Sequence, residues 1–174
     1  MDKHCFNENT TPLNGLEKYR DYFLAKNILE HNFIGFYQRE FACLDNFSSF
    51  AIVYKGVRYP TVEHAYQAMK FIDTAPNIAS RIAQATSPND AKRIAFSNQE
   101  KQNPNWHDIK VDIMEDLLRT KLDQHPYVKQ KLIKTKDYTI CEDSPIDTFW
   151  GIGENRDGQN QLGKLWMKLR DEIK

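Results

Sequence analysis

The chain has 174 residues, 40% of them hydrophobic, which is enough for one domain with a sizeable buried core. Its 24 basic and 24 acidic residues cancel, so any contact with nucleic acid must come from a local patch rather than from net charge. The widely spaced Cys5, Cys43 and Cys141 match neither a zinc knuckle nor a disulfide-rich scaffold. Without a membrane-length apolar run or a signal-like start, we expect a cytoplasmic protein with no membrane partner.

The first third of the chain alternates weak and strong signals for regular structure. Residues 16–31 carry an imperfect helical pattern, and residues 33–37 are typical of a short buried strand. A loop over residues 38–50 mixes turn formers with aromatic residues. Residues 51–59 then favour two strands joined by a turn at Lys55-Gly56.

The clearest predicted helix begins after Pro60, with Thr61 as its N-cap. One face of this helix is apolar and comprises Val62, Ala65, Tyr66, Met69 and Ile72. A second face places Glu63, Gln67 and Lys70 at i, i+4 and i+7, which gathers a carboxylate, an amide and an amine. An ordinary solvated face is the alternative interpretation of this second face.

Helices dominate the remainder of the sequence. We predict helices over residues 77–85, 88–96 after a Ser87 cap, 106–125 and 126–134, a strand over 138–141, and a closing helix over 160–173. The fold class is therefore α+β, a single mostly helical domain around a small β-sheet.

A glycine-rich loop over residues 147–158 is the second informative segment. Gly151 and Gly153 allow close approach of the backbone, whose N–H groups could bind phosphates, although the spacing is neither a dinucleotide fingerprint nor a P-loop. A glycine-rich turn around a core Trp150 is the alternative. Glu63 and Asp147 supply the two carboxylates that glycosidic cleavage needs, and sequence does not show whether they meet.

Together these segments resemble the NADAR family, also called YbiA-like. The resemblance is carried by residues 33–37, 45–48, 59–71, 105–106, 147–151 and 160–163. It runs from about residue 33 to the C-terminus, so we predict an N-terminal extension over residues 1–32 and a NADAR-like N-glycosidase domain over 33–174.

The resemblance implies an enzyme that hydrolyses N-glycosidic bonds of ribosyl substrates, with no metal or redox cofactor. The favoured substrate is ADP-ribose on guanine in nucleic acid, with a cognate ADP-ribosyltransferase toxin as a partner. The first alternative is a phosphoribosylamino-pyrimidine intermediate of riboflavin synthesis, a small ribosylamino nucleotide. A non-catalytic ADP-ribose-binding module and a protein that neutralises a toxin by contact are the others.

The resemblance also implies site residues. Glu63, Lys70 and Asp147 would be catalytic. In one route the base amine departs directly while Glu63 stabilises positive charge at C1 or activates water; in the alternative route Lys70 captures an opened ribose as a Schiff base. Glu63 and Lys70 could instead form a simple ion pair. Substrate contacts are implied for Asn46, Phe47, Ser48, Gln67, Trp106, Trp150, Gly151, Gly153 and Asn160.

Overall fold

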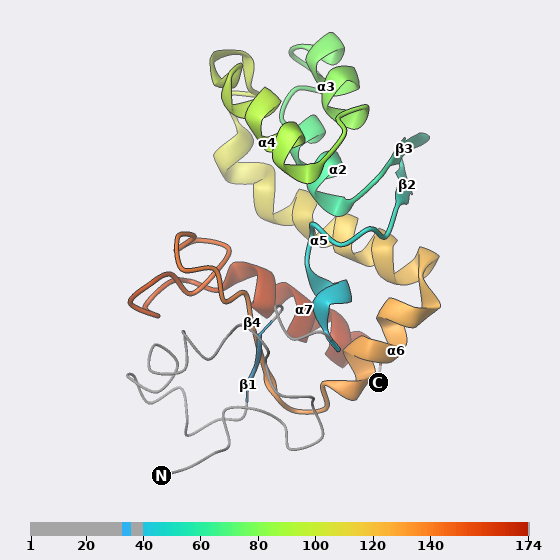
Figure 1. Ribbon diagram of the computed structural model, residues 1–174, viewed down its shortest axis with the longest axis vertical. Helices are drawn as coiled ribbons and strands as arrows, with labels where there is room; N and C mark the ends of the chain where they lie inside the picture. The colour runs from blue at the N-terminus through green and yellow to red at the C-terminus, as the bar shows by residue number, and fades with distance from the viewer. Residues whose placement is uncertain (1–32, 36–39, 174) are drawn as a thin grey trace. The chain divides into compact units, whose positions relative to one another are not determined.

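The computed structural model describes residues 33–35 and 40–173, and within them it confirms the α+β prediction (Figure 1). The predicted helix over residues 16–31, Cys5 and the second part of the strand over 33–37 lie outside the described residues. The chain divides into two compact units. The central unit is residues 46–126, and the terminal unit comprises the described residues up to 45 and from 127.

Nearly every element of the central unit forms where the sequence predicts it. These elements are β2 (Ile52–Tyr54), β3 (Val57–Tyr59), α2 (Val62–Met69), α3 (Pro76–Ala83), α4 (Pro88–Phe96), η4 (Gln99–Lys101) and α5 (Trp106–Gln124). Helices α3, α4 and α5 all contact α2, which places α2 at the centre of the unit. Local capping explains the accuracy, because Ser87 accepts a hydrogen bond from the Asp90 N–H at the start of α4.

The predicted hairpin pairs β2 with β3 in antiparallel register, with Ile52 opposite Tyr59. Its turn residues Lys55 and Gly56 have φ of 50° and 78°, the left-handed conformations of a two-residue hairpin turn. The Gln124 side chain fixes the hairpin to α5, because it accepts from the Val53 N–H and donates to the Val53 carbonyl, both at 2.8 Å. The hairpin is therefore anchored to the helix that carries part of the candidate site.

Helix α2 is buried on all sides, although three of its eight residues are polar. Every residue from Val62 to Met69 is buried, and the Glu63 and Gln67 side chains are only 6% and 5% exposed. The interpretation of the second face as solvated is therefore wrong. The physical reason is that neighbouring helices cover α2, so its polar side chains must find partners inside the protein.

The terminal unit contains β1 (Phe33–Gly35), η3 (Ala42–Leu44), α6 (Pro126–Lys134), β4 (Thr139–Cys141) and α7 (Gln161–Glu172). Strands β1 and β4 pair in parallel, with Ile34 beside Ile140. The expected single small sheet is thus two separate two-stranded ladders among the described residues. The two strands of a hairpin are neighbours in the sequence, whereas the strands of a parallel pair come from distant parts of the chain. The hydrophobic periodicity of a strand does not show which of these pairings it makes.

Helix α7 packs on β4 and holds the terminal unit together. The fully buried Trp166 donates its indole N–H to the Leu44 carbonyl at 3.0 Å. Buried Arg170 donates to the Thr135 hydroxyl and to the Tyr138 carbonyl. In the part of the chain that the structure describes, no helix combines the length and apolar character that a bilayer span requires.

Candidate active site

Glu63 lies in the first turn of α2 within a buried polar cluster. Its backbone N–H donates to the Asn46 carbonyl at 3.1 Å, which fixes the preceding loop against the helix. Its carboxylate Oε1 accepts from Gln67 Nε2 at 2.8 Å, one helical turn further on. The structure thus brings together Asn46, Glu63 and Gln67, all of which the sequence predicts as site residues.

Two amide oxygens in this cluster accept no hydrogen bond from the residues that the structure describes. They are Asn46 Oδ1 and Gln67 Oε1, and both side chains are more than nine-tenths buried. Asn46 Nδ2 approaches only the Met114 sulfur, at 3.5 Å. Because an unsatisfied buried acceptor is costly, these two oxygens are suited to receive donors from a ligand.

His64 is adjacent to Glu63, but its bonds give it a structural role. Its Nε2 lies 3.1 Å from the Ala85 carbonyl, which can only accept, so Nε2 carries the proton. Its Nδ1 lies 2.8 Å from the Thr61 hydroxyl, which also accepts from the His64 backbone N–H. Burial lowers the pKa of His64, although the bond to Ala85 opposes this. The ring is therefore neutral and stabilises the start of α2.

Lys70 ends α2 in a half-buried aromatic setting. Its Nζ lies 5.4 Å from the centroid of the Tyr66 ring and 5.8 Å from that of Trp106. Burial lowers the pKa of Lys70, and the positive charges of Lys92 and Lys110 lower it further, while the Glu63 carboxylate partly opposes them. A lysine with a lowered pKa offers more neutral amine at physiological pH.

The Glu63–Lys70 ion pair considered from the sequence is not formed. Within the described residues Lys70 has no salt bridge. The Glu63 carboxylate instead accepts a hydrogen bond from Gln67. The two side chains are two turns apart on one face of α2, and Gln67 lies between them. The amine of Lys70 is therefore directed to aromatic rings rather than to a carboxylate.

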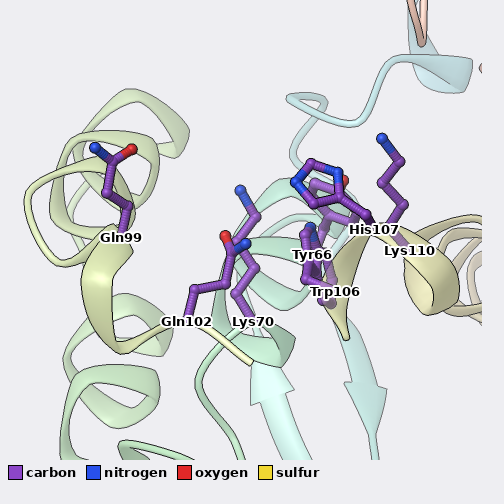
Figure 2. Close-up of a pocket in the computed structure, with 7 residues that line it drawn as sticks. All are labelled: Tyr66, Lys70, Gln99, Gln102, Trp106, His107 and Lys110. Atoms are coloured by element: carbon purple, nitrogen blue, oxygen red, sulfur yellow. The ribbon is translucent and has the colours of Figure 1, made fainter. Parts of the chain in front are cut away.

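A pocket of about 410 Å³ opens at the C-terminal end of α2. Figure 2 shows the aromatic residues and His107 between the extended side chains of Lys70 and Lys110. The lining comprises Tyr66, Lys70, Gln99, Gln102, Trp106, His107 and Lys110. The pocket therefore combines an amine of lowered pKa, two aromatic rings in tilted contact and further nitrogen-bearing side chains.

Sequence reasoning finds only part of this lining. Lys70 and Trp106 are predicted, and Tyr66 is assigned to the apolar core face of α2. Lys110 follows Trp106 by four residues and so shares its helix face, a spacing that could have pointed to it. Gln99 and Gln102 come from a polar loop with no distinguishing pattern, so only the tertiary structure reveals them.

Phe47 and Ser48 lie in the loop that precedes the hairpin. The Phe47 ring faces Lys92, whose Nζ lies 5.5 Å from the ring centroid. Ser48 accepts a hydrogen bond at 2.8 Å from Lys121, a lysine of α5 that is fully buried. These contacts anchor the loop to the helices, and substrate binding by Phe47 and Ser48 stays a prediction.

Asp147 and Trp150 belong to the terminal unit, where Asp147 shapes a turn. Its Oδ1 accepts from the Phe149 N–H at 2.9 Å and from the Trp150 N–H at 2.7 Å. The Trp150 ring meets the Phe149 ring edge-on, with centroids 5.0 Å apart. Burial raises the pKa of the neighbouring Glu142, with smaller contributions from other carboxylates that include Asp147. Asp147 thus has a structural task, and its catalytic role stays a prediction.

The glycine-rich loop uses its backbone groups internally. The Gly153 N–H donates to the Ser144 carbonyl at 3.1 Å, so it is engaged within the loop. A Cβ at Gly151 would lie 2.8 Å from two backbone oxygens, which explains the need for glycine there. The Asn160 side chain accepts from the Glu142 N–H and donates to the Ile140 carbonyl, so it joins the start of α7 to β4.

Comparison with known proteins places this chain and its fold in a family. The sequence profile of the NADAR domain matches residues 22–174. The chain belongs to the NADAR family. The match begins ahead of residue 33, where the sequence predicts the domain boundary, and the boundary itself stays a prediction.

Relatives of this NADAR chain cover most of its length. N-glycosidase Npun_R5314 of Nostoc punctiforme is 35% identical over 135 residues, which are 77% of this chain and 86% of that protein. N-glycosidase YbiA of Escherichia coli is 30% identical over 150 residues, 85% of this chain and 92% of that protein. Its solution structure matches with a TM-score of 0.73 and 31% identity over 81% of this chain and 84% of that chain. The YbiA-like fold and the N-glycosidase class predicted from the sequence are confirmed.

A further relative is part of a longer protein. Riboflavin biosynthesis protein PYRR, chloroplastic, of Zea mays is 36% identical over 159 residues, which are 83% of this chain and 26% of that protein.

The site residues predicted from the sequence fall into two groups. Asn46, Phe47, Ser48, Glu63, Gln67, Lys70 and Trp106 lie in the central unit, and Asp147, Trp150, Gly151, Gly153 and Asn160 lie in the terminal unit. The catalytic roles of Glu63 and Asp147 stay predictions.

Proposed function

We propose that this NADAR enzyme cleaves the bond between C1 of a ribose and an exocyclic amino group, with Lys70 as the nucleophile. The observation that carries the proposal is the environment of Lys70: a half-buried amine of lowered pKa, beside two aromatic rings and without a salt bridge among the described residues. A lysine attacks carbon only as the neutral amine, and burial in an apolar setting favours that form.

In the proposed reaction the ring oxygen of the ribose takes up a proton from solvent and its bond to C1 breaks, so that C1 becomes the carbon of a protonated imine with the nitrogen of the base. The neutral Nζ of Lys70 adds to C1, one proton passes from Nζ to the nitrogen of the base, and the bond from C1 to that nitrogen breaks. The base leaves as a free amine, and C1 stays joined to Nζ as a protonated Schiff base. Water adds to this imine, which releases the ribose as an aldehyde and restores the lysine.

Glu63 and its neighbours would serve the same reaction. The Glu63 carboxylate would accept a proton from the attacking water, a role for which it is held by Gln67. The buried oxygens of Asn46 and Gln67 would accept hydrogen bonds from ribose hydroxyls. Tyr66 and Trp106, whose ring centroids lie 5.1 Å apart, would form an aromatic wall against the base.

Two substrates fit this chemistry. The substrate that the sequence favours is ADP-ribose on guanine in nucleic acid, and a cognate ADP-ribosyltransferase toxin would then supply it. The second is a phosphoribosylamino-pyrimidine, which is favoured by the similarity to a maize protein named for riboflavin biosynthesis. Both join C1 of a phosphorylated ribose to an amine, so one mechanism serves either.

The test is product release from both substrates by the wild type, Glu63→Gln, Lys70→Arg and, as a matched control, Lys101→Gln, an exposed lysine outside the pocket. We expect Lys70→Arg to lower kcat by about 10²-fold to 10⁴-fold, because a guanidinium does not become neutral. Borohydride added during turnover should trap a ribosyl adduct on the wild type and none on Lys70→Arg.

Other outcomes contradict specific parts of the proposal. Full activity of Lys70→Arg without an adduct would favour direct departure of the base assisted by Glu63. Binding of ADP-ribose without turnover of either substrate would favour a non-catalytic module. A tight complex with a toxin that is indifferent to Glu63→Gln would favour neutralisation by contact.

A further inference from the structure

The basic side chains that line the pocket beside Lys70 indicate a negatively charged ligand. The lining supplies two lysines, a histidine and two glutamines, and no carboxylate lines it among the residues that the structure describes. Lys70 and Lys110 both line this opening, and the positive charge of Lys92, which lies outside the lining, also acts on Lys70, where the Glu63 carboxylate opposes it. A concave site with charge of one sign concentrates ligands of the opposite sign.

The N-terminal turn of α5 adds to this charge. Trp106, His107 and Lys110 come from that turn, and Lys110 shares a face with both because it lies three and four residues further on. Helix α5 has 19 residues, and its N-cap Asn105 makes no side-chain capping bond. The positive end of the helix dipole therefore lies at the same side of the pocket. Asp108 in this turn is exposed and does not line the pocket.

We infer that Lys110 and His107 bind a phosphate carried on the C5 oxygen of the ribose whose C1–N bond is cleaved. This inference rests on the proposed function for the placement of C1 at Lys70. A diphosphate of ADP-ribose and a phosphate monoester of a ribosylamino nucleotide both present this group, so the subsite recognises chemistry common to the two substrates. Figure 2 shows His107 and Lys110 at the side of the pocket opposite Gln99. Lys110 acts here as a substrate-binding residue separate from the catalytic amine.

The experiment measures binding without turnover. The probes are methyl β-ribofuranoside 5-phosphate and unphosphorylated methyl β-ribofuranoside, neither of which has a free aldehyde that could react with Lys70. Their dissociation constants are measured by titration with the wild type, Lys110→Gln and Lys101→Gln. Lys101 is a suitable control because it is an exposed lysine of the adjoining η4 segment that does not line the pocket.

We expect the wild type and Lys101→Gln to prefer the phosphorylated probe by about tenfold or more, and Lys110→Gln to lose this preference. His107→Gln should also reduce the preference for the phosphorylated probe. A preference that survives Lys110→Gln overturns the inference, as does a wild type that binds both probes equally or neither of them. The result is independent of catalysis, so a phosphate preference in a protein without turnover would contradict the proposed function and leave this subsite supported.

Discussion

Two neighbouring bases on α2, His64 and Lys70, show how environment assigns the role of a residue. Both have a lowered pKa, and burial is the main cause for each. The nitrogens of His64 are both occupied, by Ala85 and Thr61, so the ring is a structural element. Lys70 instead meets the faces of two aromatic rings in a pocket. The contacts of the two side chains, more than their pKa values, distinguish the proposed nucleophile Lys70 from the structural residue His64.

The positive charge near Lys70 leads us to predict how kcat/KM depends on pH. Because Lys92 lowers the pKa of Lys70, the substitution Lys92→Gln should raise that pKa. The neutral amine then appears only at higher pH, so the acidic limb of kcat/KM should move to higher pH. Profiles of kcat/KM against pH for the wild type and both variants Lys92→Gln and Lys101→Gln check this. A shift towards lower pH, or an equal shift in Lys101→Gln, would contradict the assignment of the limb to Lys70.

At the scale of elements, α2 and α4 have similar N-cap residues, Thr61 and Ser87, but the two caps differ in what they support. Thr61 and Ser87 each accept a hydrogen bond from the backbone N–H three residues further on. Thr61 also holds the buried His64 ring, and the turn that it caps carries Glu63. The cap of α2 therefore supports the candidate site directly, whereas the turn that Ser87 caps carries no predicted site residue.

This difference predicts separate effects on stability and activity. Thr61→Val should lower the free energy of unfolding by about 2 kcal/mol, because it removes a cap and leaves a buried ring nitrogen unpaired. Ser87→Ala should lower it by about 1 kcal/mol. Only Thr61→Val should also reduce kcat/KM, and Thr61→Ser should restore most of it. Denaturant unfolding and initial rates measure both quantities, and an equal loss of activity in Ser87→Ala would refute the distinction.

At the scale of the whole molecule, the absence of net charge limits the electrostatic contribution to nucleic-acid binding. Equal numbers of basic and acidic residues give no long-range attraction to a polyanion. A modified base in DNA or RNA would then be recognised through the pocket and a few phosphate contacts.

The expected result is a weak dependence on salt. KM for an oligonucleotide with ADP-ribosylated guanine should change by no more than about tenfold between roughly 50 mM and 200 mM salt, since only one or two phosphates would be contacted. The same titration with the small phosphoribosylamino substrate is the control for effects on the enzyme. A change of about 10³-fold or more for the oligonucleotide alone would reveal an extended basic surface and contradict this expectation.

Local signals in the sequence determined most elements of this protein. The caps Thr61 and Ser87, Pro88 at the first position of α4 and the turn at Lys55-Gly56 each act within four residues, so the structure follows them closely. The segments that resemble the NADAR family likewise placed the chain in that family before its fold was known.

Only the tertiary structure decided what surrounds the reactive groups. Burial of the polar face of α2 and the lowered pKa of Lys70 depend on helices that pack against α2 from distant parts of the sequence. The pocket joins residues of α2 to the segment over 99–110, and the buried Lys121 reaches back to Ser48. Desolvation and charge act through space, whereas periodicity and capping act along the chain. Local sequence therefore determines the helices, and tertiary packing determines the lowered pKa of Lys70.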